Sequence, residues 1–597
     1  MNRNDRTNLI RRISEIEGLT DKERSTLLGL LRKSKSYGLV WEDKPEAVED
    51  KMQEELPVLK EVKERALISK DKDAPNHILI EGDNLEALTT LAYTHAGRID
   101  VIYIDPPYNT GNKDFVYNDS FVDREDTYRH SKWLSFMSRR LRIAKQLLSD
   151  KGVIFISIDD NEQAQLKLLC DEVFGEDSFV ANIIWKHTQQ SKNDELHFSR
   201  QYNYTLCYAK QKDCLHRFYF ERTEEDNKNY KNPDNDPKGV WRSGDVRSPN
   251  YRKTLCFDII APNGTVIHAP QNGWRWSEES IKEKIKSREI IFKQDYSGII
   301  RKIYLCDQKG RTPENLWEGP RFGTTRQAAA TIKDIFDGVQ VFDTPKPHEL
   351  IMRIEEIASS QDSTILDFFA GSGTTLHATM QLNAEDGGHR QCILVTNNEN
   401  GICENVTYER NKRVIQGYTT PKGEQVAGLT GNTLRYYKTD FVDRSRSVQN
   451  MRRLVNLSTD MLCIKEDLYA EQPTFCGERT YKNIFRYFDN GQKQMLVIYR
   501  EEVIERLVEL IYSMDVEDKI KIYVFSPSED PWEDSFEDVS DKVELCALPA
   551  AIYNAYRRIL PKKKDAVVSP EADAQATNEK ENQTDGMLNV TDEGDEA

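Results

Sequence analysis

The chain has few features of a membrane, secreted or zinc-binding protein. In its 597 residues, no apolar run approaches the roughly 20 residues that a membrane-spanning helix needs. The first residues, MNRNDRTNLIRRISEIEG, lack the apolar stretch of a signal peptide. The ten cysteines stand singly, with no C-x-x-C pair and no Cys/His cluster at zinc spacing. We therefore expect a cytoplasmic protein with reduced, mostly buried thiols and no metal site.

Two common nucleotide-binding signatures are also missing. The sequence contains no G-x-x-x-x-G-K-[ST], so it has no P-loop, and no group of residues that indicates a nuclease. Its one Gly-x-Gly loop lacks the third glycine of the dinucleotide-binding fingerprint. The sequence therefore disfavours an ATPase, a nuclease and a nicotinamide-dependent oxidoreductase.

Charge is distributed unevenly along a chain whose net charge is −17. Residues 565–597 hold ten acids and one lysine, without aromatic residues or periodicity, which predicts a disordered acidic tail. Residues 238–335 instead hold 18 Lys and Arg against 11 Asp and Glu. One basic module inside an acidic protein is compatible with a polyanionic partner, although a solvated surface has the same composition.

Changes in residue pattern divide the chain into six segments. These are a charged segment of helical pattern (1–70), a first α/β stretch (71–211), an insertion of short β-like pieces (212–335), a second α/β stretch (336–440), a further α/β region (441–564) and the acidic tail (565–597). Strands alternate with helices on both sides of the insertion, which predicts one doubly wound parallel sheet built from two separated stretches. Ligands bind such sheets beyond the carboxyl ends of the strands.

The sequence VIYIDPPYNTG, residues 101–111, ends an apolar strand with a carboxylate, two prolines and a tyrosine. Pro106 and Pro107 fix φ and lack N–H donors, so the Pro106 carbonyl stays as an acceptor beside the Asp105 carboxylate. Two fixed acceptors suit an amino group on a base, and Tyr108 offers a face for stacking worth about 1–3 kcal/mol. Such acceptors would make the nitrogen more tetrahedral and reactive towards a methyl group placed in line. The alternative is an ordinary turn, which Asp-Pro commonly begins.

A second apolar strand leads into ILDFFAGSGTTL, residues 365–376, and then into a helix. From Asp367 onwards, Gly371 and Gly373 allow a sharp turn and close approach of a ligand to the free N–H groups of the helix start. Phe369 is expected either to cover an adenine ring or to fill the core. Glu399 follows the next apolar strand, where an acid usually holds a ribose diol, although it could equally be a solvated loop acid.

The segments DPPY at 105–108 and FAGSG at 369–373 together resemble the motifs of amino-group DNA methyltransferases that use S-adenosylmethionine. The order resembles the β class of these enzymes, because the DPPY segment precedes a long insertion and the glycine loop follows it. GDNLEAL at 82–88 and TPKPHEL at 344–350 resemble further blocks of that class.

The resemblance covers residues 77–211 and 336–436. Size and layout, with TLRYYKTDFVD at 433–443 after the core, resemble the modification (Mod) subunit of type III restriction-modification systems. This resemblance implies a homodimer and a separate restriction subunit for ATP hydrolysis and DNA cleavage. Residues 1–70 and 441–564 are then the candidate segments for dimerisation and partner contact.

The resemblance also implies a role for each site residue. It implies a Rossmann-like core in residues 71–211 and 336–440, in which Asp105 and the Pro106 carbonyl hold the adenine N6 amino group and Tyr108 stacks on the base. The resemblance also places a set of residues around the cofactor: Asp367, Phe369, Gly371, Gly373, Glu399, Asp83, Lys346 and Pro347. Of these, Lys346 and Pro347 would lie near its methionine end.

The insertion at 212–335 becomes the target-recognition domain of this resemblance. Its candidate DNA contacts are Arg242, Arg247, Arg252, Lys253, Arg275, Arg301, Arg311, Arg321 and Arg326. Trp241, Trp274 and Trp276 each lie next to one of these arginines in the sequence. Arginine can contact phosphates or read guanine edges, and the sequence does not separate the two. The base must leave the duplex to reach Asp105, so base flipping is implied.

An adenine N6-methyltransferase of double-stranded DNA is not the sole function compatible with these motifs. A cytosine N4-methyltransferase uses the same chemistry, but its family more usually has serine in place of Asp105. A cytosine C5 enzyme is excluded, because its nucleophilic cysteine follows a proline and this chain has no Pro-Cys dipeptide. The sequence is also compatible with an RNA substrate, with a solitary enzyme that has no restriction partner, and with a non-catalytic DNA-binding specificity scaffold.

Overall fold

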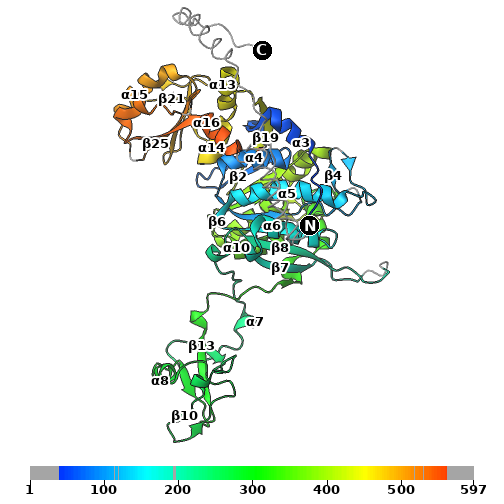
Figure 1. The fold of residues 1–597 in the computed structure, drawn as a ribbon, viewed down its shortest axis with the longest axis vertical. Helices are drawn as coiled ribbons and strands as arrows, with labels where there is room; N and C mark the ends of the chain where they lie inside the picture. The colour runs from blue at the N-terminus through cyan, green and yellow to red at the C-terminus, as the bar shows by residue number, and fades with distance from the viewer. Residues whose placement is uncertain are drawn as a thin grey trace, which may run out of the picture. The chain divides into compact units, whose positions relative to one another are not determined.

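The computed structural model describes residues 39–560, except 113, 119, 192–195, 517, 529 and 558. The helix expected at the N-terminus and the acidic tail expected at 565–597 lie outside the described residues. The chain divides into two compact units. Met1–His216 and Asn315–Ala597 form what we call the larger unit, and Arg217–Glu314 form the insertion unit. Figure 1 shows the elements of both.

The larger unit is built on a ten-stranded mixed sheet. In spatial order its strands are β1 (Glu55–Glu61), β19 (Thr433–Asp443), β2 (Asn76–Glu81), β16 (Gln391–Thr396), β15 (Thr364–Asp367), β3 (Ile99–Ile104), β6 (Leu148–Ile158), β8 (Tyr202–Ala209), β7 (Phe179–Lys186) and β14 (Leu316–Trp317). Neighbours from β19 to β6 run parallel, whereas β8 is antiparallel to both β6 and β7.

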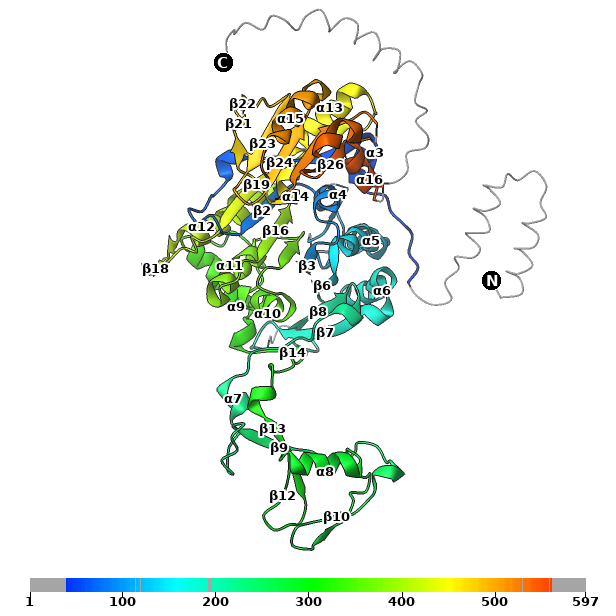
Figure 2. The same ribbon diagram turned by 90° about the vertical axis from the view of Figure 1, so that its left-hand side faces the viewer.

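Helices cover both faces of this sheet, as a doubly wound fold requires. They are α4 (Asn84–Thr94), α5 (Arg129–Leu147), α6 (Gln163–Phe174), α9 (Thr325–Ile335), α10 (His348–Ala358), α11 (Thr374–Asp386) and α12 (Glu409–Gln416). Figure 2 shows α4, α5 and α6 on one face, and α10 and α11 on the other. Because both faces are covered, the central strands carry long apolar runs, and Ile102, Ile154 and Leu366 are fully buried. The predicted doubly wound sheet from two separated stretches is therefore confirmed.

Strand β15 lies directly beside β3 although a long insertion separates them in the chain. Ile365 pairs with Val101 and Leu366 with Ile102, in parallel. Parallel strands end at the same edge of a sheet. The segment after β3, which begins at Asp105, and the glycine loop after β15 therefore leave the sheet side by side.

The described part of residues 1–70 differs from the helical segment that we expected. Helix α3 (Ala47–Glu54) is present, but β1 follows it at once and pairs antiparallel with β19. Leu56, Val58 and Leu59 are buried in the core of the larger unit. The segment forms a strand because its apolar residues complete the edge of the sheet, which a local helical pattern does not reveal.

The insertion is also shorter than the predicted 212–335. Its compact unit ends at Glu314, because β14 pairs in parallel with β7 and α9 contacts α12 of the larger unit. Arg321 and Arg326, which we expected in the insertion, therefore belong to the larger unit.

The insertion unit has its own small core. Its elements are α7 (Glu224–Asn227), α8 (Glu278–Lys286), the hairpin of β10 (Ile259–Ile260) and β11 (Val266–Ile267), and a sheet of β12 (Ile290–Phe292), β13 (Ile299–Tyr304) and β9 (Trp241–Gly244). Trp274, Ile281, Ile290 and Ile299 are buried together. Lys302 is also buried and pairs with Asp234 and Asp236.

The C-terminal region of the larger unit carries a second, five-stranded sheet. Its strands are β20 (Glu471–Gln472), β23 (Phe485–Asp489), β24 (Gln494–Ile498), β25 (Ile520–Phe525) and β26 (Val543–Leu548), with helices α13 (Val448–Leu457), α14 (Thr459–Glu466), α15 (Ile504–Tyr512) and α16 (Ala550–Arg557). The Tyr556 hydroxyl donates to the Pro57 carbonyl at 2.6 Å, which ties α16 to β1. No helix in the described part of the chain could cross a membrane.

Short two-stranded pairs complete the described β-strands. They are β4 (Val116–Tyr117) with β5 (Ser120–Phe121), β17 (Tyr418–Thr419) with β18 (Gln425–Val426), and β21 (Thr474–Phe475) with β22 (Glu478–Arg479).

Candidate active site

Asp105 to Tyr108 leave β3 at its carboxyl end and line a cavity of about 730 Å³. The Tyr108 hydroxyl donates to Asp105 Oδ1 at 2.9 Å, and the ring is only partly buried. Burial, with the nearby Asp105 carboxylate, raises the pKa of Tyr108 well above its ordinary value, so the phenol stays neutral. The ring is therefore not sealed in the core, and one part of it faces the cavity.

The two proline carbonyls have different surroundings. The buried Trp133 of α5 donates from Nε1 to the Pro107 carbonyl at 2.8 Å. No donor to the Pro106 carbonyl occurs among the described residues, and Pro106 lines the cavity. Pro106 thus keeps a free acceptor beside Asp105, while the next peptide is fixed from behind.

A buried polar cluster holds the chain just after Tyr108. Asn109 has φ of 58° and is fully buried, and its Nδ2 donates to Glu162 Oε1 at 2.6 Å. His130 Nδ1 lies 2.6 Å from the same oxygen. Burial raises the pKa of Glu162 to about 8. Because asparagine tolerates a left-handed backbone, this residue turns the loop back while Glu162 fixes its direction.

The glycine loop after β15 lies on the same cavity. Gly371 and Gly373 have φ of 49° and 73°, in the left-handed region. A Cβ on Gly373 would lie 2.4 Å from Asn411 Nδ2, and one on Gly371 would lie 3.3 Å from the Phe342 ring. Only glycine fits the Gly373 position without rearrangement. Beyond the loop, Thr374 and Thr375 begin α11 and also line the cavity.

Side chains beneath the loop hold its shape. Asp367 is buried and accepts from the Phe369 N–H at 2.9 Å and from Thr375 Oγ1 at 2.5 Å. Burial raises its pKa to about 7. From the other side, the buried Arg410 donates to Thr374 Oγ1 at 2.6 Å, and Thr407 Oγ1 donates to the Gly371 carbonyl at 2.6 Å.

Lys346, expected near the methionine end of a cofactor, contacts the Asp105–Tyr108 loop. Its Nζ is 2.5 Å from Asp105 Oδ2 and 5.1 Å from the centre of the Tyr108 ring. Both oxygens of Asp105 therefore have a donor. Lys346 comes from the segment before α10, 241 positions away in the chain, so no local sequence pattern predicts this pair.

Four expected cofactor residues are not among those that line the cavity, namely Gly373, Glu399, Pro347 and Asp83, although Phe369 and Gly371 are. Glu399 is exposed at the start of a 3₁₀ turn, and the residues of that strand end that do line the cavity are Thr396 and Asn397. Pro347 is the residue before α10. Asp83 is the N-cap of α4 and accepts from the Leu85 N–H at 2.7 Å.

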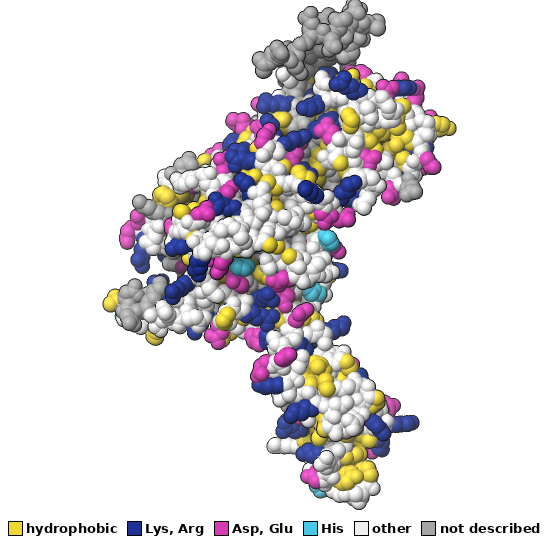
Figure 3. Space-filling model, turned by 180° about the vertical axis from the view of Figure 1, so that it is seen from behind, with side chains coloured by type: hydrophobic (Ala, Val, Ile, Leu, Met, Phe, Trp, Pro, Cys, Tyr) yellow, Lys and Arg dark blue, Asp and Glu magenta, His cyan; other side chains and the backbone are white. Residues whose placement is uncertain are grey.

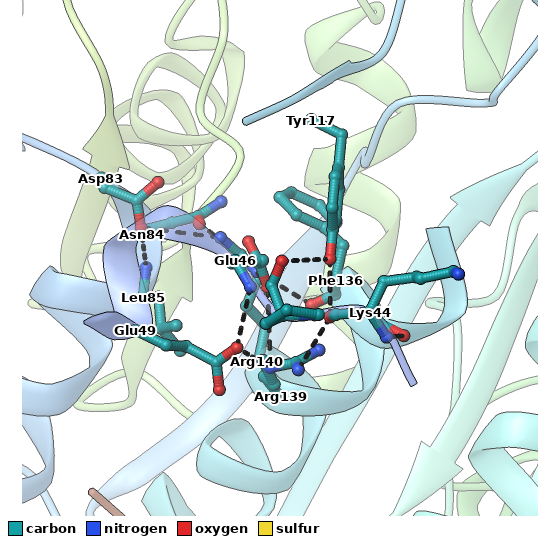
Figure 4. A network of polar contacts seen from close by, with 12 residues as sticks. Lys44, Glu46, Glu49, Asp83, Asn84, Leu85, Tyr117, Phe136, Arg139 and Arg140 are labelled. Carbon is teal, nitrogen blue, oxygen red and sulfur yellow. Dashed lines mark hydrogen bonds and ion pairs between the residues drawn. The ribbon is translucent and has the colours of Figure 1, made fainter. Parts of the chain in front are cut away.

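Asp83 instead borders a polar network centred on Arg140 of α5, shown in Figure 4. Arg140 is fully buried and donates to Glu46 Oε1 at 2.9 Å, and also to Asn84 Oδ1. Its Nη2 lies 3.6 Å from Asp83. Asn84 in turn donates to the Phe368 carbonyl at 3.2 Å, so the network reaches the backbone of the glycine loop. No sequence signal pointed to Arg140 or Glu46, since each is an ordinary charge in a helical stretch.

The expected DNA contacts differ in exposure. Arg242, Arg247, Arg252, Lys253, Arg275 and Arg326 are exposed, whereas Arg301, Arg311 and Arg321 are partly buried. Arg247 pairs with Asp245, Arg301 with Glu289, and Arg311 with Asp226 and Glu314. Trp241 and Trp274 are buried within the insertion unit and are therefore not available for stacking on a base. On the face drawn in Figure 3, basic side chains of this unit stand among hydrophobic and acidic ones.

Comparison with known proteins agrees with this geometry. A family profile described as DNA methylase matches residues 99–417, more than half of the chain. The Mod subunit of the type III enzyme StyLTI from Salmonella typhimurium is 40% identical over 362 residues, which cover 56% of this chain and 54% of that subunit. The EcoPI Mod subunit of Escherichia phage P1 is 33% identical, covering 61% of this chain and 64% of that subunit.

A shorter relative is covered more fully. The type II methyltransferase M.KpnI of Klebsiella pneumoniae is 34% identical over 389 residues, which cover 58% of this chain and 87% of that enzyme. The chain belongs to the DNA methylase family, and its matched region contains both the DPPY loop and the glycine loop. The matched part of the chain spans only about one half of the StyLTI Mod subunit and about two thirds of the EcoPI Mod subunit.

Proposed function

We propose that this protein transfers a methyl group from S-adenosylmethionine to the N6 amino group of an adenine flipped out of double-stranded DNA. The observation that carries the proposal is the shared cavity, in which the Asp105–Tyr108 loop and the Gly371–Gly373 loop leave neighbouring parallel strands. A base amino group and a donor of an electrophile can meet there, and proximity is the main requirement of direct transfer.

The residues beside the glycine loop fit an adenosyl cofactor. Phe369 supplies an aromatic face, and Gly371, which has no side chain, lets a ligand approach the backbone closely. The first turn of α11 offers backbone N–H donors at Thr374 and Thr375. Thr396 and Asn397 provide polar groups where β16 ends. When bound, S-adenosylmethionine would supply the electrophilic methyl group.

The chain's own residues prepare the amino group. Asp105 and the Pro106 carbonyl accept its two hydrogen bonds, which localises the nitrogen lone pair outside the ring. Tyr108 stacks on the base and keeps it in one plane. The Trp133 and Glu162 contacts hold these groups in place, so little reorganisation is needed during transfer. As the nitrogen becomes positively charged, the Asp105 carboxylate stabilises it until a proton leaves to water in the cavity.

Adenine is the base that we propose, because an aspartate stands where cytosine N4 enzymes more usually carry serine. Relatives named as type III Mod subunits support a role as the modification and specificity subunit of such a system. In that role the protein would act as a homodimer with a separate restriction subunit. The exposed basic residues of the insertion unit, such as Arg252 and Lys253, are proposed to contact DNA.

The test is methyl transfer from labelled cofactor to duplex DNA, followed by sequencing of the modified bases. Asp105→Ala should reduce transfer by about 10²–10³-fold or more, since it removes a charged group from the reacting nitrogen. Cofactor affinity should stay within about threefold, because Asp105 acts on the base. Asp160→Ala, an exposed acid on the same cavity, is the matched control and should retain activity.

The results of this test distinguish the candidate functions. Methylation of cytosine would show that adenine is not the target base. Transfer that persists in Asp105→Ala would show that the proposed mechanism is wrong. A wild-type protein that binds DNA but transfers nothing would identify a specificity scaffold instead.

A further inference from the structure

In the structure the acceptor proposed for the target amino group is already occupied. Lys346 Nζ lies 2.5 Å from Asp105 Oδ2, and the Tyr108 hydroxyl donates to Oδ1 at 2.9 Å. The Lys346 side chain is only 10% exposed, so this is an enclosed pair rather than a loose surface contact. A carboxylate oxygen can accept more than one hydrogen bond, but the ammonium on Oδ2 takes one of the places that the amino group would use.

The position of the ammonium matches the place where that amine must go. Nζ lies 5.1 Å from the centre of the Tyr108 ring, on a side chain that lines the cavity. A nitrogen that hydrogen-bonds to Asp105 while its base stacks on Tyr108 would need much the same volume. A cation over an aromatic face and a stacked base are both favourable partners of the ring, and they compete for it.

Electrostatic repulsion disfavours a state in which Lys346 and the target amino group both contact Asp105. Methyl transfer places a positive charge on the amino nitrogen, and two positive charges a few ångströms apart in a partly buried site repel strongly. An ammonium donating to Asp105 at that moment would also reduce the negative charge available to the nitrogen. The reaction is therefore favoured when Lys346 has left Asp105.

We propose that Lys346 is a displaceable stand-in for the target amino group. It pairs with Asp105 while the site holds no base, and it gives up this position when the flipped base enters. Lys346 is thus a positioning residue that acts through Asp105, and it sets an energetic threshold for base entry. This inference rests on the proposed function, because it assumes that an amino group is the ligand of Asp105.

Base entry without cofactor tests this role of Lys346. Lys346→Met keeps the length of the side chain and removes its charge. With 2-aminopurine beside the target adenine of the cognate duplex, the variant should give about fivefold more fluorescence at saturating DNA, because the competing cation is gone and the adenine leaves the stack more often. Its affinity for S-adenosylmethionine, measured by calorimetry without DNA, should stay within about twofold.

Two controls accompany this measurement. Lys132→Met removes an ion pair of similar length, 2.6 Å to Asp126, away from the cavity lining, and should change neither quantity. Lys346→Arg keeps a cation that can donate two hydrogen bonds to the carboxylate. It should be harder to displace than lysine, so the fluorescence should fall below that of the wild type. A thermal melt of each variant establishes folding, and the Arg variant carries the test if the Met variant does not fold.

Each other outcome overturns the inference. Cofactor affinity that falls tenfold or more with unchanged fluorescence would make Lys346 a cofactor ligand, and unchanged fluorescence and affinity would make the pair purely structural. Failure of the proposed function is seen separately, since the wild-type enzyme would then not methylate adenine at all.

Discussion

Charged side chains of the larger unit near the glycine loop lie between fixed partners, whereas most of the candidate DNA-contacting residues of the insertion unit are exposed or pair with nearby acids. Arg140 and Arg410 are buried and donate to three or more groups each. Arg252 and Lys253 lie at the surface. Removing a charge from water is costly unless its partners are fixed, so the buried set can define a shape. The exposed set is free to meet a polyanion.

An arginine therefore has different roles in the two units. In the larger unit an arginine can support the glycine loop without contacting a ligand, as the Arg140 network does through Asn84 and Phe368. In the insertion unit an exposed arginine can be replaced without removing any contact from the hydrophobic core. Four substitutions test this difference, in order of decreasing effect.

The largest expected effect is that of Arg140→Ala. It leaves the buried carboxylate of Glu46 without its main cation, and should destabilise the fold by about 3–5 kcal/mol. Chemical denaturation with urea measures the change. Arg142→Ala is the matched control on the same helix, since Arg142 is half-exposed and its ion pair is with Glu172, and should cost less than about 1 kcal/mol. Equal losses in the two variants would show that the buried network does not stabilise the larger unit.

The next effect is that of Gly373→Ala in the glycine loop. The new Cβ would lie 2.4 Å from Asn411 Nδ2, at φ of 73°, so the loop must shift at a cost of about 1–3 kcal/mol. We expect cofactor binding to weaken by about 10–100-fold, measured by calorimetry. Gly298→Ala in the insertion unit has its nearest neighbour at 3.5 Å and no left-handed φ, and should leave binding unchanged. Tight binding by the Gly373 variant would argue against a rigid loop.

A smaller effect concerns pH and Glu162. Burial raises its folded pKa to about 8 from an ordinary 4.5, so the unfolded chain loses this proton first as pH rises. The contribution of Glu162 to stability is therefore full below about pH 4.5 and is lost as pH rises towards 8. Glu162→Gln should remove this slope and make the variant more stable relative to wild type at about pH 9 than at about pH 5. Melting temperatures across this range measure it, and parallel curves for the two proteins would contradict it.

The smallest expected effect is that of Arg247→Ala in the insertion unit. Its partner Asp245 is two positions away and exposed, so the melting temperature should stay unchanged within measurement error. If Arg247 contacts a phosphate, DNA affinity should fall and the slope of log affinity against log salt should decrease by about 1. A titration at several salt concentrations checks this, and a stability loss like that of Arg140→Ala would erase the contrast between the units.

Prediction from the sequence succeeded where the signal was local. The apolar runs before Asp105 and Asp367 predicted strands, and the prolines and glycines predicted rigid loops at their carboxyl ends. Local pattern was misleading about the strand at 55–61 and about the end of the insertion. Both depend on strands that are distant in sequence, β19 for the first and β7 for the second. A short apolar segment has no fixed structure until such a partner is present.

By itself, the sequence determined the chemistry of the parts: a carboxylate beside a proline carbonyl, an aromatic ring, and a loop that only glycine can form. Only the tertiary structure decided that β15 lies next to β3, so that the two loops share one cavity, and that Lys346 reaches Asp105. The physical reason is that side-chain type and backbone restriction act over a few residues, whereas parallel strand pairing depends on how the whole core packs.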